Sequence, residues 1–154
     1  MNKLLKYALA ALLVILVALQ FFGPAAPETR AENPEDIFVL EQVDDDVTRL
    51  LRDACYDCHS METEYPWYAH IAPVSWRIYA HVDHGREELN FSEWGSLKKI
   101  GKVKRLKDIE EVLEEGEMPL KDYLLLHPEA KLSDTQRESL MSWADGLSRK
   151  VMGK

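Results

Sequence analysis

The chain has 154 residues, with 19 Lys and Arg against 27 Asp and Glu, which gives a formal net charge of −8 at pH 7. This length is typical of one domain, and the excess of acids argues against nucleic-acid binding, because binding to phosphates needs a basic surface. Two cysteines are too few for a disulfide-rich scaffold or a four-thiolate zinc site. The aromatic residues, together with 30% charged residues, indicate a folded core with a solvated surface rather than a disordered chain.

The N-terminal segment, residues 1–27, has the pattern of a membrane-targeting sequence. Lys3 and Lys6 precede an uncharged run that begins at Tyr7, and counting through Ala26 gives 20 residues, about 30 Å of helix and enough to cross a bilayer. Two interpretations remain open, a cleaved signal peptide and an uncleaved transmembrane helix, of which we favour the second. In either case the basic start predicts that the rest of the chain faces the periplasm of a bacterial inner membrane.

The remainder of the chain is predicted to be a polar linker, residues 28–36, followed by one domain, residues 37–154. Four segments of this domain have apolar residues at helical spacing, and no stretch alternates with period two. The four helices are predicted from Asp44 into Cys55, from Val74 to Leu89, from Leu97 to Glu115, and from Ser133 onward. Gly116 suits the end of the third helix, and Ser133 with Gln136 forms a capping box at the start of the last. We therefore predict an all-α domain.

The segment Cys55-Tyr-Asp-Cys-His59 has the C-x-x-C-H spacing of covalent c-type haem attachment. Two thiols one helical turn apart can add to the two vinyl groups on one porphyrin edge, and the adjacent His59 then reaches the iron as proximal ligand. Other uses of the cysteines are weaker: a thioredoxin-like pair needs a βαβ setting, zinc needs further ligands, and a disulfide across this spacing closes too short a loop to stabilise much. The prediction is one haem c, attached through Cys55 and Cys58.

Further motifs accompany this segment along the chain. They are Glu64-Tyr-Pro-Trp-Tyr68, Ile71-Ala-Pro-Val-Ser-Trp76, Leu89-Asn-Phe-Ser-Glu-Trp94, Glu115-Gly-Glu-Met-Pro119 and the stretch from Tyr123 to Ser133. In combination they resemble the bacterial haem-binding domain family over about residues 35–150. The resemblance implies a small, cytochrome c-like domain with one haem and a membrane tether, and it implies no particular redox partner.

The sixth iron ligand is predicted to be Met118, in a loop before the last helix. This layout resembles class I cytochromes c, in which the distal methionine occupies such a loop, and Pro119 stiffens the loop. A thioether ligand favours ferrous iron and raises the reduction potential. The alternative is that Met118 fills a gap in the core; His127 is then the best substitute ligand, ahead of His81 and His84. Without a sixth ligand the haem would be five-coordinate and open to a gas.

The surroundings of the haem are predicted from the same class I pattern, in which a proline carbonyl accepts the N–H of the proximal imidazole. Pro73, 14 residues after His59, is the matching position, although it also suits a helix start. Trp67 and Trp76 are predicted to wall the haem and exclude water, with an ordinary place in the core as the alternative.

The function predicted is electron transfer by a membrane-tethered periplasmic carrier, not catalysis. The alternatives are a haem-based sensor of gas or redox state, or a haem enzyme, with an open sixth position; a third is an interaction module in which haem is structural. The redox partner is not identified by the sequence. The basic run between Lys98 and Lys107 could dock an acidic partner or lie near anionic lipid, or it is simply a solvated helix face.

Overall fold

The computed structural model describes residues 2–153, and no strand occurs among them. Met1 and Lys154, at the ends of the predicted segments 1–27 and 37–154, lie outside the described residues. The α-helices are α1 (Lys3–Leu19), α2 (Ile37–Leu40), α3 (Asp45–Leu51), α4 (Asp57–His59), α5 (Val74–Glu88), α6 (Lys99–Glu114) and α7 (Asp134–Met152). A π-helical turn, η1 (Arg52–Tyr56), and the 3₁₀ turns η2 (Trp67–His70), η3 (Phe91–Ser96), η4 (Tyr123–Leu125) and η5 (Pro128–Ala130) complete the set. The predicted all-α class is confirmed.

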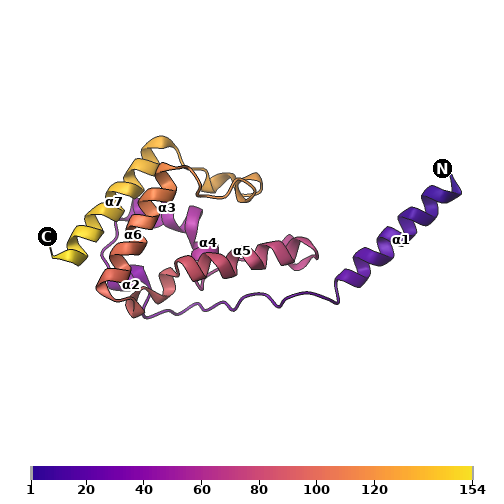
Figure 1. Ribbon diagram of the computed structural model, residues 1–154, viewed down its shortest axis with the longest axis horizontal. Coiled ribbons are helices and arrows are strands. Elements are labelled where there is room, and N and C mark those ends of the chain that lie inside the picture. Colours follow the sequence, from indigo (N-terminus) through magenta and orange to yellow (C-terminus); the bar gives the residue numbers. More distant parts are fainter. Residues whose placement is uncertain (1, 154) are drawn as a thin grey trace.

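The core of the protein forms around α6 and α7, which lie side by side, with α3 packed against α7 (Figure 1). Most of the core side chains come from these three helices and from η3, among them Leu50, Leu51, Phe91, Trp94, Leu106, Leu113, Leu140, Ala144 and Leu147. Burial of each large side chain in this set contributes about 1.5–3 kcal/mol to folding. The core therefore fixes α3, and the helical segment that continues from α3 carries the cysteines.

The end of α6 and the start of α7 are those expected from their capping residues. Ser133 Oγ accepts a hydrogen bond from Gln136 N at 3.2 Å, and Gln136 Oε1 accepts one from Ser133 N at 2.8 Å. Gly116 follows the last residues of α6 at φ +69°, in the left-handed conformation that commonly ends a helix. The predicted capping box and the predicted helix end at Gly116 are both confirmed.

The N-terminal helix α1 projects from the body, and an extended segment joins the two (Figure 1). The helix has 17 residues and stops at Leu19, whereas the uncharged run of the sequence continues past Gly23 and Pro24. Among residues 2–153, no helix combines the length and the apolar character needed to cross a membrane. The observed helix is thus shorter than the span expected from the sequence.

The predicted linker, residues 28–36, ends in contact with the body. Asp36 is buried, and its carboxylate accepts hydrogen bonds from Phe38 N at 2.9 Å, Tyr56 Oη at 3.0 Å and Ser92 Oγ at 3.2 Å. A buried carboxylate with three donors is well compensated for its loss of water. Asp36 thereby joins the start of the domain to the helix that carries the cysteines.

Candidate haem-binding site

The C-x-x-C-H motif lies on one continuous helical segment made of α3, η1 and α4. The π-helical turn η1 contains Cys55, and α4 contains Cys58 and His59. Such turns widen an α-helix locally and occur frequently at functional sites. Both cysteines are free thiols and half-buried, so they remain available for attachment.

Tyr56 holds this segment against the core. Its side chain is buried and stacks between Phe38 and Phe91, with ring centroids 4.8 and 5.1 Å apart respectively. Its hydroxyl donates the hydrogen bond to Asp36 described above. Stacked aromatic pairs stabilise a core by about 0.5–1.5 kcal/mol beyond the area that they bury. One face of the motif is therefore fixed to the core.

A cavity of about 270 Å³ lies between the motif, α5 and the loop after α6. The motif lines it with Cys55, Cys58 and His59, and the loop lines it with Met118. The other residues of its wall are Ala54, Asp57, His81, His84, Gly85, Pro119, Leu120 and Tyr123. A c-type haem uses two thiols for attachment to the porphyrin, and an imidazole and a thioether can serve as its two axial ligands. The residues that the sequence predicts for attachment, proximal ligation and distal ligation are thus brought together.

The ring of His59 is oriented by a backbone carbonyl. Its Nδ1 lies 3.1 Å from Leu89 O, and because a carbonyl oxygen only accepts, Nδ1 carries the proton and Nε2 keeps its lone pair. Burial lowers the pKa of His59, which favours the neutral imidazole that metals bind. A histidine that binds a metal usually donates its other ring N–H to an acceptor, which fixes the tautomer and the orientation of the ring.

This carbonyl is not that of Pro73, which the class I pattern led us to expect. The acceptor of the His59 N–H is Leu89, whereas Pro73 is the N-cap of α5 and lines neither the cavity around His59 nor the one beside it. The reason is the path of α5, because the C-terminal end of α5 passes close to α4. Leu89 follows α5 with extended backbone, so its carbonyl leaves the helix and meets His59.

Gly85 is what allows α5 to pass so closely. A Cβ built at this position would lie 2.6 Å from Cys58 O, a distance at which either helix would have to move. Glycine inside a helical pattern often marks such a close approach, and this was the available sequence signal for the crossing of α5 over the motif.

The loop that carries Met118 is fixed on both sides. Glu117 N and Met118 N donate to Val112 O at 3.0 and 3.3 Å. Arg137 Nη1 donates to Leu113 O at 3.1 Å and to Met118 O at 3.3 Å. The backbone at Met118 is therefore tied to α6 and α7, and its half-buried side chain is held at the wall of the cavity.

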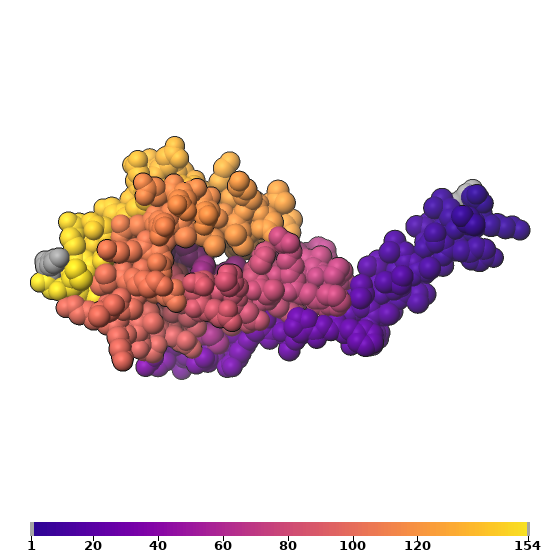
Figure 2. All heavy atoms as spheres, viewed as in Figure 1, coloured from indigo at the N-terminus to yellow at the C-terminus, as the bar shows by residue number. Residues whose placement is uncertain are grey.

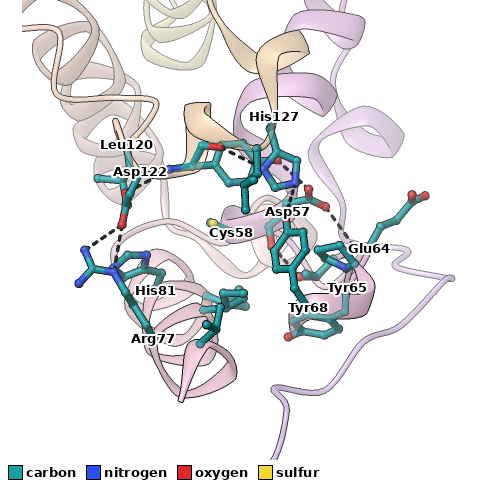
Figure 3. A pocket seen from close by; sticks show the side chains of 17 residues that line it. Asp57, Cys58, Glu64, Tyr65, Tyr68, Arg77, His81, Leu120, Asp122 and His127 are labelled. Carbon is teal, nitrogen blue, oxygen red and sulfur yellow. Dashed lines mark hydrogen bonds and ion pairs between the residues drawn. The ribbon is translucent and has the colours of Figure 1, made fainter. Parts of the chain in front are cut away.

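A second cavity, of about 210 Å³, is shown in Figure 3 and shares Cys58 and His81 with the first. His127 lies here and does not line the cavity of His59. Its Nδ1 donates to Tyr123 O at 3.1 Å, which leaves Nε2 to accept from Tyr68 Oη at 3.2 Å. Its ring also stacks on that of Tyr123, with centroids 4.0 Å apart. The predicted substitute for Met118 thus has both ring nitrogens engaged elsewhere.

Polar contacts join the motif and α5 to the segment that follows Met118 (Figure 3). Asp57 Oδ2 accepts from Tyr123 Oη at 2.8 Å, and Asp57 Oδ1 accepts from Glu64 N at 3.0 Å. Burial and the charge of Asp57 raise the pKa of Tyr123, which keeps its hydroxyl protonated. Arg77 donates to Asp122 Oδ2 through Nε at 3.0 Å and Nη2 at 2.8 Å, and this pairing lowers the pKa of Asp122. These contacts thereby hold the segment that follows Met118 against the motif and α5.

The structure does not bring Trp67 and Trp76 to either cavity. Trp67 is 75% exposed on η2, while its neighbour Tyr68 turns inward to His127. Trp76 faces the N-terminal segment at Gly23, where an added Cβ would overlap its indole. Neither indole lies in the wall of these cavities, and a place for them beside the haem stays a prediction.

The comparison with protein families gives one match, the haem-binding domain, over residues 14–146. No curated protein and no solved structure matches the chain. The matched residues include the motif, the cavity walls and the distal loop, and they make up most of the chain. The family resemblance stated from the sequence is confirmed: the chain belongs to the haem-binding domain family, and haem is its cofactor.

Proposed function

We propose that the protein carries one c-type haem, attached through Cys55 and Cys58, with His59 and Met118 as axial ligands, and that it transfers electrons. The observation that carries this proposal is the common cavity, which joins the motif to a loop about sixty residues further along the chain. A haem with these ligands supplies a one-electron iron couple. The chain supplies the orientation of His59 through Leu89 O and the fixed backbone at Met118.

The state of the thiols supports attachment over the competing uses of the cysteines. Burial, followed by the mutual effect of the two groups, raises the pKa of Cys55 to about 12; burial and Asp57 raise that of Cys58 to about 11. Thioredoxin-like pairs need a lowered pKa, because the thiolate is the reactive form. For a zinc site, no group of three or more His, Cys, Asp and Glu side chains suited to a metal occurs within residues 2–153.

The structure favours Met118 over the histidines as distal ligand. His127 is engaged in the second cavity, and the side chain of His84 is 73% exposed, with Nδ1 3.9 Å from a carboxylate oxygen of Glu87. His81 is half-buried and lines both cavities, so it is the principal rival. A Met118 ligand and a His81 ligand are distinguishable by spectroscopy.

We expect the ferric protein to show the weak near-infrared band of sulfur-to-iron charge transfer, and Met118→Ala to abolish it and lower the reduction potential. The matched control is His81→Ala, which removes a side chain from the same cavity and is expected to keep the band. The measurement is near-infrared absorption of the ferric proteins with a potential titration. A band that persists in Met118→Ala contradicts the assignment, and a high-spin wild type points to the sensor or enzyme with an open sixth position.

We also propose that residues 1–27 associate with the membrane and that the haem domain lies on its periplasmic side. Attachment of c-type haem takes place outside the cytoplasm in bacteria, and Lys3 and Lys6 precede a run without charge through Pro27. The apolar side chains of α1 are exposed rather than packed on the body. Mass spectrometry of protein extracted from membranes, showing whether residues 1–27 are retained, separates an anchor from a cleaved signal.

A further inference from the structure

Two stretches without Asp, Glu, Lys or Arg meet in this structure. The first is residues 7–27, and the second is residues 65–76, which form η2 and the start of α5. The chain as a whole has 30% charged residues, so an uncharged stretch of twelve residues in a surface region is unusual for it. The second stretch contains Trp67, Tyr68 and Trp76, and most of it lies outside the hydrophobic core.

The two stretches are docked at three points. Gln20 and Ala72 form a reciprocal pair, in which Gln20 Nε2 donates to Ala72 O at 3.1 Å and Ala72 N donates to Gln20 Oε1 at 3.0 Å. Gly23 lies against the indole of Trp76, and Tyr65 Oη donates to Pro27 O at 3.2 Å. The end of α1 is therefore held against residues 65–76 rather than joined to the domain by a free linker, as Figure 2 shows where α1 reaches the body near the start of α5.

Large apolar side chains are exposed around this junction. Phe21 is 81% exposed and Trp67 is 75% exposed. The junction patch, as we name it, consists of Phe21, Phe22, Trp67, Ile71 and Val74, all of them exposed. It continues toward η4, because Val74 and Leu126 line the same cavity and Leu126 is exposed as well.

We propose that the junction patch rests in the interface of a lipid bilayer, so that the haem domain lies on the membrane surface. This inference rests on the proposed association of residues 1–27 with the membrane. The patch is continuous with α1, whose exposed side chains are apolar and whose end is fixed to Ala72. Tryptophan is enriched at membrane–water interfaces, and residues 65–76 would bring no Asp, Glu, Lys or Arg side chain into a medium of low dielectric constant.

The test uses the full chain with its haem, in phosphatidylcholine vesicles whose acyl chains carry a photoactivated carbene precursor near the headgroup. After illumination and digestion, mass spectrometry locates lipid adducts. We expect adducts in residues 65–76 as well as in α1. The peptide with Ile100, which is 84% exposed on α6, serves as internal control and is expected to stay unlabelled.

Two variants sharpen the experiment. Trp67→Ser/Ile71→Ser is expected to reduce adducts in residues 65–76 by tenfold or more, because each of the two replaced side chains alone favours transfer from water by about tenfold. The matched control, Ile100→Ser, also removes an exposed apolar side chain and is expected to change nothing. All three replaced side chains are exposed, and an unchanged haem spectrum verifies the fold of both variants.

Adducts in α1 without adducts in residues 65–76 would overturn the inference and leave the association of residues 1–27 standing. Adducts in neither segment would overturn both this inference and the proposed association of residues 1–27 with the membrane. Haem that stays bound in the same sample would leave the haem proposal intact. Cross-links between copies that disappear on dilution to one chain per vesicle, in place of lipid adducts, would assign the junction patch to a second copy and overturn the inference.

Discussion

Replacing both cysteines of the motif, as Cys55→Ala/Cys58→Ala, is expected to reduce the haem that survives denaturation from one per chain to none. The thioether bonds are the covalent link, and coordination by His59 ends when the chain unfolds. The two thioether sulfurs are uncharged, so the replacement removes no charge from the site. The measurement is haem staining after a denaturing gel, together with extraction of the haem by acidified solvent.

The single replacements are the matched controls for this experiment. Cys55→Ala and Cys58→Ala each leave one thiol in the wall of the cavity, so each is expected to keep a haem that resists extraction. Retention of haem by the double variant after denaturation would contradict covalent attachment through these residues.

Replacement of Gly85 by alanine is expected to destabilise the protein and to lower its haem content. The new Cβ would lie 2.6 Å from Cys58 O, and overpacking of this kind costs typically about 1–3 kcal/mol. Relief of the contact moves α5 from the motif and draws Leu89 O away from His59, whose orientation depends on it. Urea unfolding measures the loss of stability, and the ratio of haem to protein absorption measures the loss of haem.

Gly146→Ala is the matched control, because it makes the same change inside α7. A Cβ at Gly146 meets nothing within 4 Å, so alanine there is expected to stabilise the protein by about 0.5–1 kcal/mol through its better helix propensity. The two variants should therefore change the free energy of unfolding in opposite directions. Equal stabilisation by both would show that α5 does not pass the motif closely.

The helices α5, α6 and α7 were predictable because their signals are local. Apolar spacing identifies the buried face of a helix of fifteen residues or more, and Ser133 and Gly116 satisfy backbone groups within their own turn. The C-x-x-C-H motif is local in the same sense, since its spacing alone places both thiols near His59. These features need no knowledge of the rest of the chain.

The partner of His59 could not be predicted in this way. A backbone carbonyl has the same chemistry at every residue, so nothing in the side chain of Leu89 indicates its role. Pro73 was expected by analogy with another chain path. The contact of Asp57 with Tyr123 also depends on the tertiary path, because it joins residues 66 positions apart.

The positions of the aromatic side chains show a second limit. Trp67 and Tyr68 are neighbours in η2, a turn of only four residues, and so short an element has no periodicity from which to infer its buried face. Tyr68 turns to His127, whereas Trp67 is exposed. The apolar character of tryptophan predicts that its side chain is buried, but the path of the chain leaves that of Trp67 exposed.

The most direct measurement of the central claim is the absorption spectrum of the denatured, reduced wild-type protein in alkaline pyridine. Pyridine replaces the axial ligands, so the position of the α band then reports only the substituents of the porphyrin. Attachment at both Cys55 and Cys58 predicts the short-wavelength band of a haem whose two vinyl groups are saturated. A band at the position of unmodified protohaem would contradict covalent attachment at the motif.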